Sequence, residues 1–215
     1  MAREGVPVIL LLLLVLLVLA VGAIVTHQRL LWGLVAITGA FILFSVYFFR
    51  DPHRIVPAGD NLILAPADGK IIVIEKVNEP EFFKGEALQV SIFMSAFNVH
   101  VNRVPITGQV VYFNYRKGAY HPAYKDEASF SNEQSAIGIQ NDNIQIFMKQ
   151  IAGIFARRIV CHLREGHKVK AGERFGMIKF GSRIDLFLPI SVQLQVKMDQ
   201  KVTAGTTIIG TYTAR

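Results

Sequence analysis

Two long runs without a charged residue stand near the start of this 215-residue chain, and they limit what its first quarter can fold into. One run covers residues 6–25 and the other residues 30–49, so each has 20 residues. A helix of that length rises about 1.5 Å per residue and can cross a hydrocarbon core of about 30 Å. Residues 26–29 form a short polar connector. We therefore expect a transmembrane helical hairpin over residues 1–49.

A cleaved secretory signal peptide is the alternative interpretation, and it explains the first run only. It is less favoured because no small-residue cleavage site followed by a polar segment is evident. The basic residues indicate the orientation: Arg3 precedes the first run, Arg50 and Arg54 follow the second, and Arg29 lies in the connector. The positive-inside rule then places both ends in the cytoplasm. We predict a protein of the cell membrane with a cytoplasmic domain over residues 50–215.

The charge balance is basic, with a net charge of +7 and a pI near 9.6. Basic surfaces bind nucleic acid or anionic membranes, and the adjoining hairpin favours the membrane. Cys161 is the only cysteine, which excludes an intrachain disulfide and a zinc site made of several thiolates. It stands in the apolar stretch 159–163, which indicates a buried structural thiol.

Short alternating patterns dominate the chain after the hairpin. Pro66, Gly69, Pro105 and Gly108 interrupt them, and no long amphipathic helix is evident after residue 60. Alternation with period two is typical of half-buried strands. We therefore predict one mainly β domain, of the β-rich α+β class. Its expected strands are residues 70–77, 88–93, 108–115, 144–148, 154–163, 184–188 and 192–197.

A short repeat lies near the C-terminus. Lys-Val-Lys-Ala-Gly at residues 168–172 returns as Lys-Val-Thr-Ala-Gly at residues 201–205. This pattern resembles the hairpin repeat of lipoyl- and biotinyl-type barrel-sandwich domains, although no carrier turn with a lysine lies between the copies. We expect a lipoyl-like arrangement in which both hairpins press on residues 176–188. The polar residues 115–132 are expected to form either a mobile loop over the site or an ordinary surface loop.

Gly181 and Ser182 lie between the two copies and between two alternating apolar runs. A glycine inside a strand pattern marks a bulge or a strained turn. Strain beside a hydroxyl favours its attack on the preceding carbonyl. From the spacing alone, however, a plain Gly-Ser turn between two strands is the favoured interpretation, so the surrounding motifs have to decide.

Four motifs follow one another along the chain. Residues 49–57 read Phe-Arg-Asp-Pro-His-Arg-Ile-Val-Pro, and residues 64–70 read Leu-Ala-Pro-Ala-Asp-Gly-Lys. Residues 97–105 read Phe-Asn-Val-His-Val-Asn-Arg-Val-Pro, and residues 174–185 contain the Gly-Ser bond. In that order they resemble the first motif, the aspartate motif, the histidine motif and the self-cleavage segment of the phosphatidylserine decarboxylases of the short-chain branch. Each motif alone is weak, but four in sequence make a specific match.

The resemblance implies a proenzyme that cleaves itself between Gly181 and Ser182. The products are a β chain of residues 1–181 and an α chain of residues 182–215, which stay together as a heterodimer or within a higher oligomer. The resemblance also implies that Ser182 becomes a covalent pyruvoyl group, which acts as an electron sink as pyridoxal phosphate does elsewhere. No metal and no added organic cofactor are implied.

The family's Asp–His–Ser arrangement implies His100 as the base and Asp68 as the residue that holds its tautomer. Without the resemblance, Asp68 fits an Asx-Gly turn and His100 a strand histidine. Longer members carry a second histidine where this chain has Arg103, so His121 and His162 stay alternative bases. Arg103 is interpreted as a clamp for a substrate phosphate or carboxylate, or else as part of a structural salt bridge.

The implied activity is decarboxylation of phosphatidylserine, or of a related serine phospholipid, to phosphatidylethanolamine. The expected partners are that lipid and an anionic membrane, with no nucleic acid. A non-enzymatic, membrane-anchored lipoyl-like binding module explains the hairpin and the repeat equally well, but it leaves the Ser182 segment unexplained. A serine hydrolase is disfavoured because Lys-Phe-Gly-Ser-Arg-Ile-Asp at residues 179–185 lacks the Gly-x-Ser-x-Gly pattern.

Overall fold

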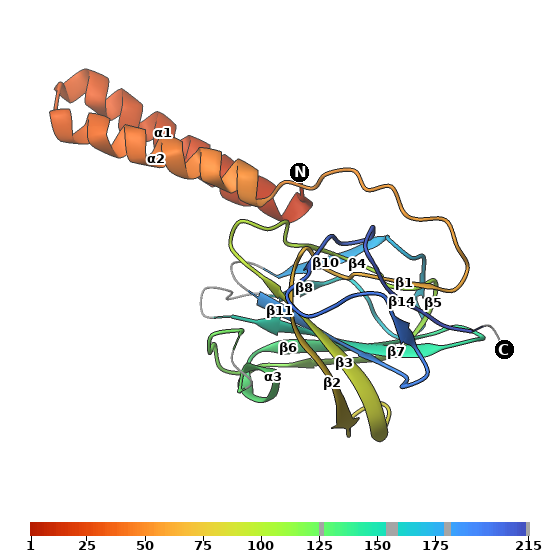
Figure 1. Cartoon of the computed structure of the whole chain (residues 1–215). Coiled ribbons are helices and arrows are strands. Elements are labelled where there is room, and N and C mark those ends of the chain that lie inside the picture. The colour runs from red at the N-terminus through yellow and green to blue at the C-terminus, as the bar shows by residue number, and fades with distance from the viewer. Residues whose placement is uncertain (125–126, 154–158, 179–181, 214–215) are drawn as a thin grey trace. The chain divides into compact units, whose positions relative to one another are not determined.

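The computed structural model describes residues 1–124, 127–153, 159–178 and 182–213 (Figure 1). It divides into two compact units, Met1–His53 and Arg54–Arg215. The predicted cleavage residue Gly181 lies outside the described residues.

The first unit is a pair of apolar helices. A short 3-10 turn, η1 (Arg3–Gly5), leads into α1 (Val6–Thr26), and α2 (Arg29–Phe48) follows. Between them His27 takes a left-handed conformation with φ 54°, which ends α1 and lets the chain reverse. Leucines such as Leu10 and Leu17 are each 61% exposed. Both helices are long and apolar enough to cross a membrane, by length and composition.

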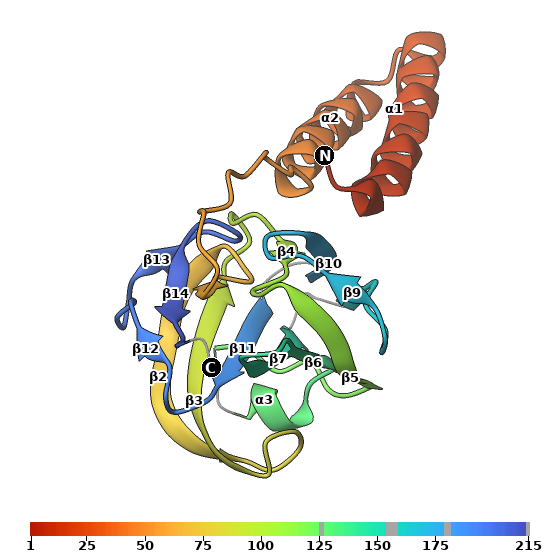
Figure 2. The ribbon, with the colours of Figure 1, turned by 90° about the vertical axis from the view of Figure 1, so that its right-hand side faces the viewer.

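The second unit is built on one curled antiparallel sheet, which forms an open half-barrel (Figure 2). Its eight strands run in the order β13-β2-β3-β11-β7-β6-β5-β9, and two three-stranded sheets, β1-β14-β12 and β4-β10-β8, complete the unit. The elements are β1 (Leu62–Leu64), β2 (Gly69–Glu79), β3 (Gly85–Met94), β4 (Val101–Arg103), β5 (Gly108–Arg116), α3 (Ala128–Ser131), β6 (Gln134–Gln140), β7 (Gln145–Ala152), β8 (Ile159–Cys161), β9 (Lys168–Val169), β10 (Arg174–Ile178), β11 (Ser182–Leu188), β12 (Gln193–Leu194), β13 (Lys201–Val202) and β14 (Ile208–Thr211).

The strand β11 lies in the middle of the large sheet and is buried on both faces. Ile184, Leu186 and Leu188 belong to the main hydrophobic core. The alternating residue Phe187 belongs to a second, aromatic cluster with Phe147 and Phe82 on the other face. Because successive side chains of a strand point to opposite faces, Ser182 lies on the face of the main core and Arg183 on the other.

The sheet has an approximate two-fold arrangement that includes the sequence repeat. The two copies of the repeat supply the edge strands β9 and β13, which pair with β5 and β2 respectively. Gly172 and Gly205 end the two copies, with φ of 80° and 71°, a conformation that glycine adopts readily. The Gly172 N–H donates to the Val104 carbonyl (2.8 Å) and the Gly205 N–H to the Ala65 carbonyl (2.9 Å). The copies therefore have equivalent neighbours in the two halves.

Asp68 and Thr107 hold equivalent positions in the two halves of the sheet. Each follows a proline by two residues and precedes the glycine that begins a long strand. The Asp68 Oδ1 accepts a hydrogen bond from the Ala204 N–H (2.8 Å), and the Thr107 Oγ1 accepts one from the Ala171 N–H (3.0 Å). One of the two Asp68 carboxylate oxygens thus makes a contact that the fold uses twice.

The β-rich prediction is confirmed. Four predicted strands lie inside β2, β3, β5 and β11, and the one predicted over residues 144–148 overlaps β7. The strand predicted over residues 192–197 is wrong in length, because β12 pairs with its neighbour β14 at two residues only. The prediction for residues 154–163 is borne out at Ile159–Cys161, and residues 154–158 lie outside the described part. The strand β6 was not predicted from the sequence. Its glutamines, serine and glycine give no alternating apolar pattern, although every residue except Gln140 is buried.

Candidate functional site

Ser182 occupies the first described position of β11, where two neighbouring strands hold it. It pairs with Met94 of β3 on one side and with Ala152 of β7 on the other. The residue is fully buried, yet its Oγ has no hydrogen-bond partner among the described residues. A buried hydroxyl without a partner costs about 1–3 kcal/mol. The fold therefore accepts an unfavourable serine here, and its hydroxyl makes no structural hydrogen bond within the described part.

His100 lies close in space to the segment that precedes Ser182. It follows the loop from β3 to β4 and is fully buried. Its carbonyl accepts a hydrogen bond from the Ile178 N–H (3.4 Å), and Ile178 is the last described residue before Ser182. The next residue, Val101, pairs with Met177 in the β4–β10 ladder. His100 is therefore fixed to the strand that leads into the candidate cleavage segment.

Asp68 lies near the C-terminal end of β3, on the side where β3 pairs with β2 and not with β11. Its carboxylate accepts a hydrogen bond from the Arg54 side chain at Oδ2 (2.7 Å), in an ion pair whose side chains are 18% and 13% exposed. The following Gly69 lies so close to the Phe93 carbonyl that a Cβ there would be 2.3 Å from the oxygen. The end of β3 thus joins three predicted residues: Gly69 adjoins Asp68, Met94 pairs with Ser182, and the outgoing loop leads to His100.

Arg103 is directed into the protein. It is 8% exposed, and its guanidinium donates a hydrogen bond to the Gly172 carbonyl (2.9 Å). Its stem also packs against Gly205, where a Cβ would lie 2.8 Å from the arginine Cδ. Arg103 therefore holds the two copies of the repeat together, and this placement favours a structural part. Contact with a substrate headgroup stays a prediction.

A buried amide pair, which the sequence reasoning missed, lies on the Ser182 face of the sheet. Gln150 donates from Nε2 to Asn102 Oδ1 (2.8 Å), and Asn102 donates from Nδ2 to the Met94 sulfur (3.7 Å). Both amides are fully buried. The available signal was Gln150 itself, a polar residue in a strand whose other buried positions are all apolar. Buried amides of this kind fix the side chains around a site, because each lost bond is costly.

Asn132 brings His121, one alternative base, to the same strand end. The Asn132 amide brackets the His121 backbone, accepting from its N–H (2.9 Å) and donating to its carbonyl (2.8 Å). It also donates to the carbonyl of Ala152 (2.7 Å), the residue that pairs with Ser182. The His121 side chain is exposed. The other alternative, His162, is exposed as well, and its N–H donates to the Phe175 carbonyl (2.8 Å), toward the other end of β10.

The opposite face of β11 carries a charged network. Arg183 pairs with Asp185 and also donates to Ser91 on β3 (3.0 Å), and Ser129 of α3 donates to Asp185 (2.9 Å). A cavity of about 320 Å³ adjoins this network. Lys149 pairs with Glu81 there (2.6 Å). Burial raises the pKa of Glu81, but the hydrogen bond and charge of Lys149, together with hydrogen bonds from Tyr112 and Asn114, outweigh it, so that pKa lies below its ordinary value.

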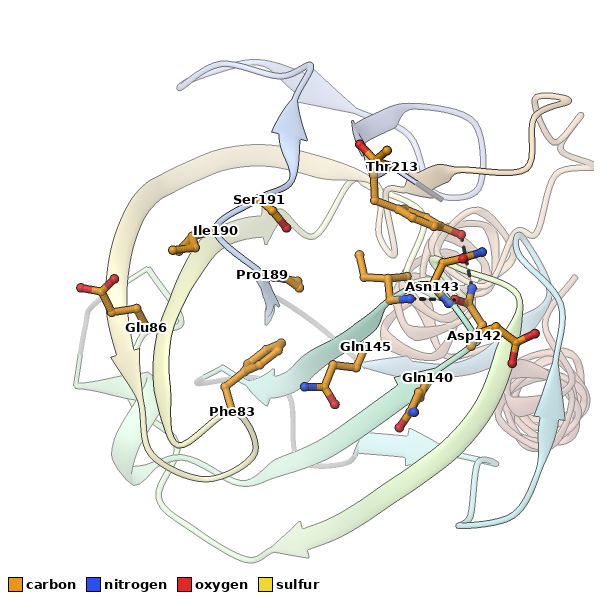
Figure 3. Close-up of a pocket in the computed structure, with 13 residues that line it drawn as sticks. Phe83, Glu86, Gln140, Asp142, Asn143, Gln145, Pro189, Ile190, Ser191 and Thr213 are labelled. Atoms are coloured by element: carbon orange, nitrogen blue, oxygen red, sulfur yellow. Dashed lines mark hydrogen bonds between the residues drawn. The ribbon is translucent and has the colours of Figure 1, made fainter. Parts of the chain in front are cut away.

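A larger cavity, of about 510 Å³, lies at the other end of β11, beyond Leu188 (Figure 3). Carboxamide side chains such as Gln140 and Gln145 share its wall with Ile190 and Ser191. The seven residues of β11 make six steps of about 3.3 Å, so about 20 Å of strand separates Ser182 from Leu188, next to this cavity. None of the predicted site residues lines this cavity.

Two further observations concern metal ligands and the single thiol. The part of the chain described here contains no cluster of three or more His, Cys, Asp or Glu side chains that could hold a metal ion. Cys161 is partly buried, and burial raises the pKa of its thiol to about 11. The thiol is therefore protonated at neutral pH and is a poor nucleophile.

Comparison with known proteins points to one family. The family model described as phosphatidylserine decarboxylase matches residues 41–210. A protein of Pelodictyon phaeoclathratiforme named phosphatidylserine decarboxylase proenzyme is 49% identical over 185 residues, which cover 85% of this chain and 87% of that protein. A protein of Desulfotalea psychrophila with the same name is 44% identical over 213 residues, covering 97% of this chain and 95% of that protein. The match therefore includes the strand that begins at Ser182 and the loops around it.

Proposed function

Because this chain belongs to the phosphatidylserine decarboxylase family, we propose that it decarboxylates phosphatidylserine to phosphatidylethanolamine after cleaving itself between Gly181 and Ser182. The observation that carries this proposal is the buried Ser182 hydroxyl, which the described residues leave without a structural partner in the middle of the sheet. The names of the relatives favour an enzyme over a lipoyl-like binding module.

Self-cleavage begins with attack of the Ser182 Oγ on the carbonyl carbon of Gly181. The Oγ proton passes to a base, the amide C–N bond breaks, and an ester with a free amine at residue 182 results. Removal of the Cα proton then expels the carboxylate of Gly181 and leaves dehydroalanine. Addition of one water and loss of ammonia give the pyruvoyl group. We assign His100 as the base, because its backbone is fixed beside the segment that precedes Ser182.

Asp68 assists the base through its charge. An ionised carboxylate near an imidazole favours the protonated ring that forms when the serine proton is taken up. Arg54 and the Ala204 N–H hold the carboxylate in place. Because the fold repeats the Ala204 contact at Thr107 and Ala171 with a hydroxyl, that contact needs an acceptor and not a charge. The turn contact itself therefore does not require the charge of Asp68.

The position of Ser182 fits the group that it is proposed to become. The pairing with β3 and β7 holds residue 182 from both sides, and these bonds lie after the cleaved bond. A pyruvoyl group there supplies a carbonyl that takes up the amine of the substrate and withdraws the electrons left by departing carbon dioxide. The buried surroundings, with Met94 and Ala152 on either side, exclude water from this position.

The membrane part of the proposal is that α1 and α2 span the cell membrane and leave residues 50–215 in the cytoplasm. Their apolar side chains support it, because so much exposed leucine is unfavourable in water. Carbonate or high salt should leave the full chain in the membrane fraction, whereas a chain lacking residues 1–48 should no longer need detergent for release. Complete release of the full chain by salt alone would contradict the spanning hairpin.

Intact mass measurement of the purified protein tests the cleavage. We expect two chains, residues 1–181 and 182–215, with the smaller one blocked at its N-terminus by a ketone. The variant Ser182→Ala should remain one full-length chain without activity. Ser191→Ala, which changes a serine of the cavity at the other end of β11, should cleave normally. Wild-type protein that is intact yet fully active would refute the proposal.

A further inference from the structure

Phe97 is an exposed aromatic residue at the tip of the loop that joins β3 to β4. Its side chain is 69% exposed. Residues at the two ends of the loop are buried: Met94 is 0% exposed, Val99 5% and His100 0%. The loop therefore passes from buried site residues to a largely exposed aromatic residue within a few positions.

The exposure of Phe97 is built into a rigid turn. Asn98 Oδ1 accepts hydrogen bonds from the Ser95 N–H (2.9 Å) and the Ser95 hydroxyl (2.8 Å), and the Asn98 N–H donates to the Ser95 carbonyl (3.0 Å). Turns closed by an Asn side chain in this way have a defined backbone and usually carry polar residues at the tip. Here the fixed position belongs to a phenylalanine, whose exposure to water is unfavourable.

A second exposed aromatic lies at the same end of β3. The ring of Tyr124, which is 62% exposed, packs edge-on against Phe93 with centroids 6.3 Å apart. Phe93 directly precedes Met94, the partner of Ser182. In Figures 1 and 2 the loop after β3 lies at the opposite end of that strand from the β2–β3 turn. Aromatic side chains are thus exposed at the end of β3 where Ser182 pairs.

We propose that the Ser95–Asn98 turn docks on the lipid bilayer, with Phe97 inserted at the lipid–water interface beside the site. The proposal rests on the function proposed above, because a lipid headgroup must reach Ser182, which is buried. Aromatic rings are favoured at the interface, where one end is apolar and the other wet. A bilayer is the expected occupant because the chain carries two apolar helices long enough to cross one and acts on a molecule that resides there.

A pair of variants of the full chain in vesicles tests the docking. Phe97→Ser should cleave itself to the wild-type extent and keep its rate on dissolved short-chain phosphatidylserine. Its rate on long-chain phosphatidylserine in the vesicle should fall about tenfold through a higher KM, because the interface contact is lost. Ile190→Ser is the matched control: Ile190 is 52% exposed but lies beyond Leu188, at the other end of β11. It should match wild type in all three measurements.

Other kinetic outcomes overturn the proposal. If Phe97→Ser lowers the rates on both substrates equally, Phe97 belongs to the site itself and not to a docking surface. If it prevents self-cleavage, the turn shapes the cleavage segment. If it behaves like Ile190→Ser, the turn has no part in lipid access.

Fluorescence gives a readout that does not depend on activity. Trp32 is the only tryptophan, so Trp32→Phe combined with Phe97→Trp leaves a single reporter in the turn. Vesicles with brominated acyl chains should quench this reporter but not the tryptophan of the control Trp32→Phe/Ile190→Trp. Absence of quenching overturns the docking even if the enzyme is active. A reporter in the turn that is shielded from acrylamide but not quenched by brominated lipid would indicate a protein partner and also overturn it.

Discussion

Arg183 donates a hydrogen bond to Asp185 on the face of β11 opposite Ser182, and the two side chains are 2% and 0% exposed. Taking both charges out of water is costly, so such a pair is weak support for stability by itself. Arg183 also bonds Ser91 on β3, which ties the two strands together on that face. A slip of β11 by one residue would turn both charges into the main core and move Ser182 out of it. The pair therefore penalises a shift of the strand by one residue, or by any odd number of residues.

The first prediction concerns this pair. Asp185→Ala should lower the free energy of unfolding by about 3–5 kcal/mol, because Arg183 stays buried without its partner. The double variant Arg183→Met/Asp185→Leu should recover most of that stability but cleave more slowly, since the register is less strictly set. Denaturant unfolding in detergent measures the stability of these variants in a Ser182→Ala background, where no cleavage occurs. Gels of the same variants with Ser182 retained measure cleavage. A double variant that cleaves at the wild-type rate would show that the pair serves packing alone.

The second prediction concerns the assigned base and its carboxylate. His100→Ala and Asp68→Asn should each slow self-cleavage, and loss of a positioned base typically costs about 10²–10⁴-fold in rate. Thr107→Val is the matched control for Asp68, because it removes the equivalent turn contact in the other half of the sheet without touching a charge. It should cleave at the wild-type rate. The cleaved fraction over time on gels is the measurement.

Maturation of His100→Ala at the wild-type rate would exclude His100 as the base. His121 would then be the next candidate, because Asn132 holds its backbone beside the strand pair that carries Ser182. His162, at the other end of β10, would follow. Replacement of each by alanine in the same assay separates them.

The third prediction concerns Arg103. Arg103→Ala should cleave itself but decarboxylate phosphatidylserine poorly, with the loss mainly in KM if the guanidinium meets the headgroup. Arg103→Lys should restore only part of the activity, because one ammonium does not reproduce a planar fork. Arg103→Ala also loses the bond to the Gly172 carbonyl, so its free energy of unfolding should fall by about 1–3 kcal/mol. Its melting temperature should fall accordingly. A melting temperature that falls while KM stays unchanged would leave Arg103 with a structural role alone.

The fourth prediction follows from the raised pKa of Cys161, which burial brings to about 11. At pH 8 alkylation of this thiol should be roughly a hundredfold slower than that of an ordinary exposed cysteine, and its rate should rise about tenfold per pH unit toward pH 11. Since the folded pKa lies above the unfolded one, the stability that this group contributes is present below the unfolded pKa and is lost as the pH rises through about 11. Fast alkylation at pH 8 in the folded protein would contradict the burial.

Much of this protein is determined locally along the chain. The two 20-residue runs without charge predict α-helices. The alternation around Ile184, Leu186 and Leu188 predicts a strand with one apolar face. The motifs around Asp68, His100 and Ser182 are local as well, so their resemblance to those of a known family could name the candidate residues. The repeat at residues 168–172 and 201–205 was also visible, because its two copies differ only at their middle residue.

Only the tertiary structure decided which distant segments meet. The pairing of Ser182 with Met94 and Ala152 joins strands from three parts of the chain, and many alternating strands offer equally suitable partners. The hydrogen bonds from Gln150 to Asn102 and from Asn132 to Ala152 depend on those pairings, so no local sequence pattern could predict them. A charged residue such as Arg103 is expected to be exposed when the sequence alone is considered, yet packing against Gly172 and Gly205 buries it. Strand propensity is set by each residue and its neighbours, whereas register and burial are set by which surfaces exclude water together.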